Sequence, residues 1–400
     1  MRLLVITDGV PPEHRGGVAS SVLVEVDELA RRGHDVTVLV RRHDPHQPLV
    51  QDRGAWRLLR HPAPARGSRA YYAHPAATLT RLPGWLRSLD ARERFDALYV
   101  HSTFHGAAVV RAGLGGKALY RFHAPSSVEV RLDAAGGKYP LVRAAAGVVA
   151  DLTRRAELLA VDGCVRVITA SDFMRAQLHL VHPSARAEVD VVPLAVDLER
   201  FHPAGDVERA ALRERWGVGG DGPVLLSVRR LVRRMGLENL IDAVPALRAR
   251  HPGLRVLIGG RGYLEDELRA RVERLGLAGT VQLLGFVPEE DLPGLHRAAD
   301  LFVLPTLELE GFGVVTLEAF ASGVPVVATP VGANPEVAGG LDASLLAASS
   351  TPPDLAAAVE RGLAAGPHLR SAARARVEER YAPEVVGERV ERLLVRVAGR

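Results

Sequence analysis

Residues 300–329 read DLFVLPTLELEGFGVVTLEAFASGVPVVAT, and this stretch decides the fold. It opens with the apolar run DLFVL, passes through a glycine-containing loop and continues into a segment of helical character from about Val314. A second apolar run, VPVVAT, closes it at 324–329. Short, nearly continuous apolar runs are typical of buried parallel strands, and a helix between two of them makes a strand–helix–strand unit. The stretch therefore predicts a parallel β-sheet covered by helices.

The same alternation extends over the rest of the chain. Further apolar runs lie at 2–7, 35–40, 96–100, 117–121, 164–169, 223–228, 254–258 and 280–284. Prolines and charges interrupt the pattern at 188–206. We expect an α/β protein with two doubly wound, Rossmann-like domains, residues 1–192 and 193–382, facing across a cleft. Because open sheets of this kind bind ligands at the carboxyl ends of their strands, the informative residues should follow the strands.

The composition is that of a globular protein, with 400 residues of which 47% are hydrophobic and 24% charged. Cys164 is the only cysteine, which excludes an intramolecular disulfide and a cysteine-based zinc cage. The N-terminal apolar run, Leu3 to Ile6, is too short for the core of a signal peptide. No run of about 18 apolar residues predicts a membrane span. We expect a cytoplasmic protein.

The formal net charge is +4, and arginine supplies nearly all of the positive charge, because lysine occurs only at Lys117 and Lys138. Segment 41–94 concentrates arginine: Arg41, Arg42, Arg53, Arg57, Arg60, Arg66, Arg69, Arg81, Arg87, Arg92 and Arg94. Two interpretations stay open: a genome that encodes arginine in place of lysine, or a basic face for phosphate ligands or a peripheral contact with anionic membrane. No helix-turn-helix, zinc finger or aromatic-interleaved basic motif is present, so we expect no nucleic-acid partner.

Two glutamates, Glu310 and Glu318, stand in the loop and the helix of the stretch 300–329. A carboxylate accepts hydrogen bonds from two hydroxyls at once, which suits the diols of sugars and ribose. The glycines between the glutamates allow a ligand close to the backbone. The N-terminus of the helix offers unpaired N–H groups and the positive end of its dipole to an anion such as a diphosphate.

Four arginines crowd the turn after the run 223–228: Arg229, Arg230, Arg233 and Arg234. Arginine is a bidentate donor to phosphate, so this turn predicts a second anion-binding element. Gly16 and Gly17 precede a helix that begins near Val18. Such a turn is either an anion-binding nest or a flexible turn without a ligand.

Three histidines also follow predicted strands. His123 lies in RFHAPSS at 121–127, and His101 and His105 lie in HSTFHG, where they can face a ligand at the carboxyl edge of the first sheet. The spacing of His101 and His105 fits a metal pair, but no third ligand accompanies them, and no Asp-x-Asp motif stands at a strand end. We therefore expect no metal.

Glu310, the Gly-Phe-Gly that follows it, Glu318 and GVPVVA at 323–328 together resemble the retaining glycosyltransferase family 4, the GT4 group of the GT-B fold. The resemblance covers nearly the whole chain. It implies that Glu318 holds the ribose hydroxyls and that Glu310 contacts hydroxyls of the donor sugar. The backbone that it places against sugar and phosphate runs through Gly311, Phe312, Gly313, Val314 and Val315.

The resemblance extends to other segments. In the segment that corresponds to 227–243, the family has an arginine and, five residues later, a lysine, and both bind the diphosphate. Arg230 matches the arginine, whereas Met235 stands at the position of the lysine. Arg234, beside Met235, is the candidate replacement for the lysine. His123 falls beside the donor sugar, and the Gly16-Gly17 turn near the donor phosphate and acceptor. Further matches are Gly259 and Gly260 in a loop near the nucleotide, Phe286 and Val287 near the base, Ser171 as a helix N-cap, and a C-terminal helix at 383–400 that packs back on the first domain. The segment between the domains departs from the family, with Leu194-Ala195 where Asn-Gly is usual. Asn334-Pro335-Glu336 follows the last core strand, so we expect it to face the donor phosphate or the cleft.

The function that the resemblance implies is a hexosyltransferase-type enzyme that moves a sugar from a nucleoside-diphosphate sugar to a lipid, glycan or small natural-product hydroxyl, with retention and without a cofactor. His123, Arg230 and Glu310 are the candidate catalytic residues, and Arg230, Arg234 and the helix N-terminus would stabilise the leaving phosphate. Two alternatives stay open. One is a degenerate nucleotide-sugar-binding protein, which Met235 favours, and the other is an epimerase or phosphorylase on the same fold. A phosphorylase would be expected to have a lysine for pyridoxal phosphate, and neither lysine lies in the second domain.

Overall fold

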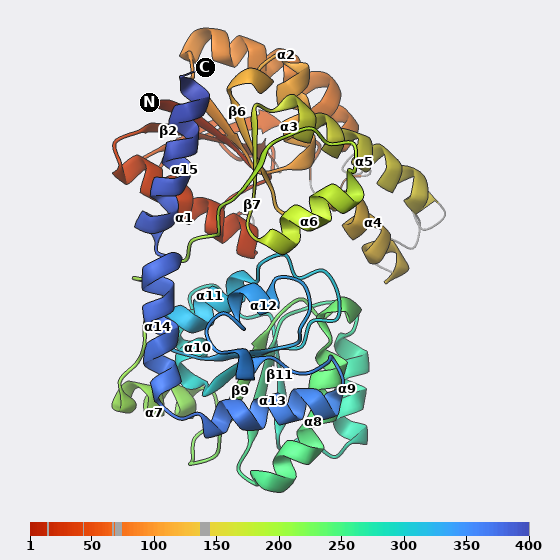
Figure 1. Cartoon of the computed structure of the whole chain (residues 1–400), viewed down its shortest axis with the longest axis vertical. Helices are drawn as coiled ribbons and strands as arrows, with labels where there is room; N and C mark the ends of the chain where they lie inside the picture. Colours follow the sequence, from red (N-terminus) through yellow and green to blue (C-terminus); the bar gives the residue numbers. More distant parts are fainter. Residues whose placement is uncertain (14–15, 43, 66–67, 69–73, 137–144, 400) are drawn as a thin grey trace. The chain divides into compact units, whose positions relative to one another are not determined.

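The computed structural model describes residues 1–13, 16–42, 44–65, 68, 74–136 and 145–399 (Figure 1). Arg66, Arg69 and Lys138 lie outside the described residues. The chain divides into two compact units: unit 1 comprises Met1–Ala195 with Pro383–Arg400, and unit 2 comprises Val196–Ala382. Each unit is an α/β fold with a sheet of its own.

Unit 1 has an eight-stranded sheet in the order β3-β4-β2-β1-β5-β6-β7-β8. The strands are β1 Arg2–Ile6, β2 Asp35–Arg42, β3 Val50–Asp52, β4 Arg57–Pro62, β5 Ala97–Val100, β6 Ala118–Phe122, β7 Arg166–Thr169 and β8 Val189–Val191. All pairs are parallel except β3 with β4. From β1 the chain order runs outward through β5 to β8 on one side and through β2 and β4 on the other, with β3 at the edge, which is the doubly wound arrangement predicted from the sequence.

Helices cover both faces of this sheet, because alternate side chains of each strand point to opposite sides. Leu3 and Val5 of β1 belong to the core under α1 and α15, which lie side by side in Figure 1, whereas Leu4 and Ile6 belong to the opposite core. The helices are α1 Gly17–Arg31, α2 His74–Glu93, α3 Thr103–Arg111, α4 Ser126–Ala135, α5 Ala146–Gly163, α6 Asp172–Val181 and α15 Pro383–Ala398, with a short 3₁₀ turn η2 at Gly115–Lys117. Ser171 caps α6 by accepting a hydrogen bond from the backbone N–H of Met174, as predicted.

Unit 2 has a five-stranded, wholly parallel sheet in the order β11-β10-β9-β12-β13. Its strands are β9 Val224–Val228, β10 Arg255–Gly259, β11 Val281–Gly285, β12 Leu301–Leu304 and β13 Val326–Ala328. Its helices are α7 Asp206–Arg215, α8 Leu237–Arg250, α9 Glu265–Arg274, α10 Leu292–Ala298, α11 Val314–Ala321, α12 Asn334–Val337, α13 Pro352–Ala364 and α14 His368–Arg380, with 3₁₀ turns η4 at Arg233–Met235 and η5 at Ala343–Leu345. The stretch 300–329 forms β12, α11 and β13, and β12 pairs with β13 in parallel, so this prediction is confirmed.

Three strands escaped prediction. β4, with the sequence RLLRHP, contains Arg60 and His61, which are buried and therefore break the apolar run on which sequence reading depends. Arg60 forms an ion pair with Glu13. β3 and β8 are edge strands of only three residues, each with a polar residue at its centre, and β3 makes the sheet of unit 1 mixed rather than parallel.

The arginine-rich segment 41–94 is only in part a surface feature. Arg41 is 7% exposed and pairs with Asp8 at 2.9 Å, and Arg60 is 1% exposed. These two side chains are therefore removed from any basic face, whereas Arg81 and Arg92 are exposed. Among the residues that the structure describes, no helix combines the length and the apolar character needed to cross a membrane.

Candidate functional site

The residues predicted to bind the donor in unit 2 gather at the carboxyl edge of its sheet. Arg229 and Arg230 follow β9, Gly260 follows β10, Phe286 and Val287 follow β11, and the loop 305–313 follows β12. Backbone hydrogen bonds join these loops: Arg229 donates to Gly259 (2.9 Å), Gly260 to Gly285 (2.7 Å) and Leu307 to Arg234 (2.8 Å). The loops therefore form one continuous surface.

Two glycines permit this close packing. Gly260 has φ +140°, and a Cβ there would lie 1.7 Å from the carbonyl oxygen of Arg229. Gly236 has φ +69°, and a Cβ there would lie 1.9 Å from the carbonyl oxygen of Pro305. Both positions combine a left-handed or mirror-β backbone with a neighbouring chain at contact distance, so only glycine fits them.

Glu310 is held in a buried polar cluster. Its carboxylate forms an ion pair with Arg229 at 2.5 Å, and both side chains are less than 10% exposed. Thr306 Oγ1 donates to Glu310 Oε2 (3.0 Å) and accepts from Arg229 Nη1 (2.6 Å). The carbonyl oxygen of Glu310 accepts from the backbone N–H of Ala333 (2.9 Å). Sequence reasoning found Glu310 but missed Arg229 and Thr306 as its partners.

The four arginines of the 229–234 turn have four different environments. Arg229 is committed to Glu310, and Arg233 pairs with Glu238 and Glu267. Arg234 Nη1 donates to the carbonyl oxygen of Leu309 (3.2 Å), so this guanidinium lies against the loop that carries Glu310. Arg230 is exposed, and its guanidinium makes no hydrogen bond or ion pair with any described residue. Of the four, Arg230 is thus the cation available to an anionic ligand.

Met235, at the position where the family has a lysine, is 4% exposed. Its side chain packs inside the protein, consistent with a thioether in place of an ammonium group. Arg234, the residue before it, carries a positive charge, and its guanidinium contacts the carbonyl oxygen of Leu309.

Glu318 lies on α11 and is 8% exposed. No described residue donates a hydrogen bond to its carboxylate, and Nε2 of His296 lies 3.8 Å from Oε2. Burial, reinforced by the negative charge of Glu289 and opposed by Arg200, raises the pKa of Glu318 to about 7. Burial and the charge of Arg200 lower the pKa of His296 to about 3, so this ring is neutral and does not neutralise the glutamate.

The N-terminus of α11 begins at Gly313, which has φ 78° and offers no side chain to cap the first turn. Val314 and Val315 are half-buried in that turn. The ring of Phe312 packs against Tyr381 with centroids 5.8 Å apart, so only the backbone of Phe312 can meet a ligand. Asn334 donates to the carbonyl oxygen of Thr329 (3.0 Å) and is 1% exposed, so its side chain holds the loop rather than facing a phosphate.

Unit 1 places its three predicted histidines in two close pairs, one of which includes His61. His123 Nε2 and His101 Nδ1 lie 3.1 Å apart, and His61 Nε2 and His105 Nε2 lie 3.0 Å apart. Burial, with the charge of Arg121, lowers the pKa of His123 to about 3, and burial is also the main cause that lowers the pKa of His101 well below its usual range. No set of three metal-binding side chains converges within the described part of the chain.

Other residues frame these pairs. Asp8, after β1, lies 3.4 Å from Nδ1 of His105 and pairs with Arg41. Gly16, with φ 133° and ψ 158°, is the N-cap of α1 and Gly17 its first residue, and both are exposed. Asp8 and Arg41 are members of this cluster that sequence reasoning did not single out.

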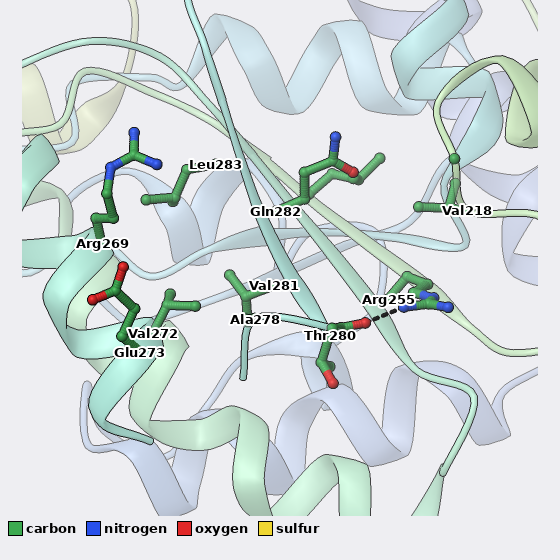
Figure 2. A pocket seen from close by; sticks show the side chains of 13 residues that line it. Val218, Arg255, Arg269, Val272, Glu273, Ala278, Thr280, Val281, Gln282 and Leu283 are labelled. Carbon is green, nitrogen blue, oxygen red and sulfur yellow. Dashed lines mark hydrogen bonds between the residues drawn. The ribbon is translucent and has the colours of Figure 1, made fainter. Parts of the chain in front are cut away.

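A pocket of about 390 Å³ lies elsewhere in unit 2 and is lined by residues of β10, α9 and β11 (Figure 2). Its polar lining includes Arg255, Arg269, Glu273 and Gln282, and Arg255 donates to the carbonyl oxygen of Gly279. None of the predicted site residues lines it. It is therefore separate from the carboxyl-edge site.

Comparisons with known proteins agree with this architecture. A family model of glycosyl transferases group 1 matches residues 208–380, and one of glycosyltransferase family 4 matches residues 15–200. The GDP-mannose-dependent alpha-(1-6)-phosphatidylinositol monomannoside mannosyltransferase of Mycolicibacterium smegmatis is 32% identical over 343 residues, 84% of this chain and 82% of its own. The D-inositol 3-phosphate glycosyltransferase of Nocardia farcinica is 30% identical over 79% of this chain and 70% of its own.

Among solved structures, the sucrose-phosphate synthase of Thermosynechococcus elongatus superposes with a TM-score of 0.78 at 22% identity, covering 99% of this chain and 98% of its own. Anabaena HepE in complex with UDP-glucose superposes at 0.74 and 20% identity, covering 99% of each chain. The fold is that of GT-B glycosyltransferases. The chain belongs to glycosyltransferase family 4, which confirms the expected fold class, family and enzyme class.

Proposed function

We propose that this chain is a retaining hexosyltransferase whose unit 2 binds a nucleoside-diphosphate sugar and transfers its sugar to a hydroxyl acceptor. The observation that carries the proposal is the carboxylate of Glu318, which is nearly buried yet accepts no hydrogen bond from any described residue. A buried carboxylate without donors is costly, and the two hydroxyls of a ribose would satisfy it.

The other residues of the carboxyl edge fit the rest of such a donor. Arg230 is the unpaired cation for the diphosphate, and the N-terminus of α11 adds backbone N–H groups and a positive dipole end. Glu310 accepts a hydroxyl of the sugar. Gly259 and Gly260 with Phe286 and Val287 form the surface for the nucleoside, where Phe286 is 44% exposed.

In the proposed reaction the bond from the anomeric carbon to the diphosphate breaks while a bond to the acceptor oxygen forms on the same face. The acceptor proton passes to the departing phosphate oxygen, and Arg230 stabilises the charge that develops there. His123 would contact the sugar as a neutral hydrogen-bonding group, since its ring is not charged near neutral pH. No cofactor or metal is part of the proposal.

The first test is thermal stabilisation by UDP, GDP, ADP and TDP and by their common sugars. GDP-mannose is the first candidate donor, because the mycobacterial relative is named as GDP-mannose-dependent. A ligand that binds only the folded protein raises its Tm by mass action. Arg230→Ala should weaken binding of the stabilising nucleotide about 10- to 100-fold, the effect of losing a charge-assisted hydrogen bond.

Arg233→Ala is the matched control, because it removes the same charge from the same turn but from a side chain paired with Glu238 and Glu267. The donor assignment would be wrong if no nucleotide shifted the Tm, or if both variants bound equally well. Binding without transfer to any acceptor would favour a degenerate nucleotide-sugar-binding protein. Turnover of the donor itself, without an acceptor, would favour an epimerase.

For the acceptor we propose a lipid presented at an anionic membrane, with the outer face of α5 as the peripheral contact. Val148, Leu152 and Leu159 fall on one side of this helix and are 65%, 57% and 39% exposed. Arg155 is exposed on the same side of the helix. Apolar side chains flanked by arginine suit a helix that lies in the headgroup region.

Sedimentation with phosphatidylcholine vesicles that contain phosphatidylglycerol measures this contact. Replacing Leu152 and Leu159 together with glutamine should lower vesicle binding at least about tenfold, because each leucine loses its apolar burial. The control is Leu180→Gln, which changes a leucine that is 72% exposed on α6. Equal vesicle binding by the wild type and both variants would refute the α5 contact and leave the donor site untouched.

A further inference from the structure

The ion pair between Arg229 and Glu310 constrains how the glutamate can meet a sugar. Oε2 of Glu310 accepts from Arg229 Nη2 (2.5 Å) and from Thr306 Oγ1 (3.0 Å). Two donors fill the two lone-pair directions of this oxygen. Oε1 remains, and a Cβ built on Gly313 would lie 3.7 Å from it, so glycine at this position leaves the approach to Oε1 open.

The guanidinium of Arg229 is held within the same cluster. Its backbone N–H donates to Gly259, its Nη1 to Thr306 and its Nη2 to Glu310, and its side chain is 6% exposed. Arg230, the next residue, is exposed and unpaired. The two adjacent arginines therefore have different roles. Arg230 is available to bind phosphate, whereas the guanidinium of Arg229 neutralises the carboxylate of Glu310.

We propose that Arg229 is a positioning residue that determines donor-sugar specificity by fixing Glu310 with Oε1 as its single free oxygen. The inference rests on the proposed function of the same site and names the part of the donor, the sugar ring, that Arg229 controls. A carboxylate held at one oxygen recognises a hydroxyl at one position and orientation, whereas a carboxylate free to rotate accepts alternative hydroxyls.

The test separates sugar recognition from nucleotide recognition. Arg229→Ala is compared with wild type for affinity toward the nucleoside diphosphate alone, and for kcat and KM with two donors that share the nucleotide and differ at one sugar hydroxyl. We expect the nucleoside-diphosphate Kd to stay within about twofold, kcat for the preferred donor to fall about 10- to 100-fold, and discrimination between the two donors to shrink by a similar factor.

Guanidinium ion supplies a second readout. Arg229→Ala leaves a space beside a buried carboxylate, so added guanidinium chloride should restore part of kcat, while sodium chloride at the same concentration should not. Arg233→Ala should change none of these quantities, because Arg233 pairs with Glu238 and Glu267 away from Glu310. If Arg229→Ala fails to fold, Thr306→Val carries the same test, since it removes one of the two donors to Oε2 and keeps the shape of the side chain.

Two outcomes would overturn the inference. A loss of nucleoside-diphosphate affinity in Arg229→Ala equal to that in Arg230→Ala would make Arg229 a phosphate ligand. Unchanged discrimination between the two donors, with nucleotide binding intact, would make Arg229 a purely structural residue. Absence of nucleotide binding by the wild type is a separate result, which removes the proposed function and the inference with it.

Discussion

Replacing Arg121 with methionine is expected to lower the free energy of unfolding of unit 1 by about 3–5 kcal/mol, the cost of leaving a buried charge without its partner. Arg121, on β6, is fully buried. Its Nη2 pairs with Glu25 of α1 at 3.1 Å, its Nε donates to the hydroxyl of Tyr99 (2.6 Å), and its Nη1 donates to the carbonyl oxygen of Val192 (2.8 Å). Without the guanidinium, the carboxylate of Glu25 would stay in the core without a positive partner.

The loss should be partly reversed when Glu25 is also replaced. Burial raises the pKa of Glu25, and Arg121 and Tyr99 oppose this rise. Arg121→Met with Glu25→Gln removes both charges, so the double variant should be more stable than Arg121→Met alone. Urea unfolding of the full chain, followed with a probe in unit 1, measures the difference. Additive effects of the two substitutions would show that the pair is not coupled and would contradict the argument.

The sheet of each unit could be predicted where burial leaves a plain signal in the sequence. β12 and β13 are apolar on both faces because helices cover both. Their consecutive apolar residues therefore identify them from the local sequence alone. β4 could not be found this way, because the buried guanidinium of Arg60 is satisfied by Glu13, 47 positions away, and by Pro48 and Gln51 of the neighbouring segment. Polar residues that are buried by distant partners look exposed in a sequence.

The same limit applies to the candidate site. Glu310 and Glu318 could be predicted, because their spacing around Gly-Phe-Gly is a local pattern that resembles a family. The pairing of Arg229 with Glu310 joins residues 81 positions apart and has no local signal. The crowding of four arginines indicated an anion site, but only the tertiary structure separates Arg230, which is unpaired, from Arg229, which is not.

Glu318→Gln is expected to stabilise unit 2 at pH 8 and to weaken nucleotide binding. The pKa of Glu318, about 7, exceeds the ordinary value of 4.5 mainly because the carboxyl is buried. A raised pKa in the folded state contributes stability that is present below pH 4.5 and is lost as pH rises through 7. At pH 8 the wild type therefore bears a cost of about 3 kcal/mol that the neutral glutamine avoids. Near pH 5 the two proteins should be much closer in stability.

Nucleotide affinity should move in the opposite direction. Ribose hydroxyls donate best to the ionised carboxylate, so wild-type affinity should rise between pH 6 and 8 as Glu318 loses its proton, and Glu318→Gln should be weaker by about 10- to 100-fold at pH 8 with little pH dependence in this range. Tm and nucleotide Kd at pH 5 and pH 8 measure both effects, with the exposed carboxyl of Glu308, in Glu308→Gln, as the control. Loss of stability at pH 8 together with unchanged affinity would make Glu318 a structural residue. A gain of stability together with a loss of nucleotide affinity would show that the buried, ionised carboxylate of Glu318 is unfavourable for folding and is kept for nucleotide binding.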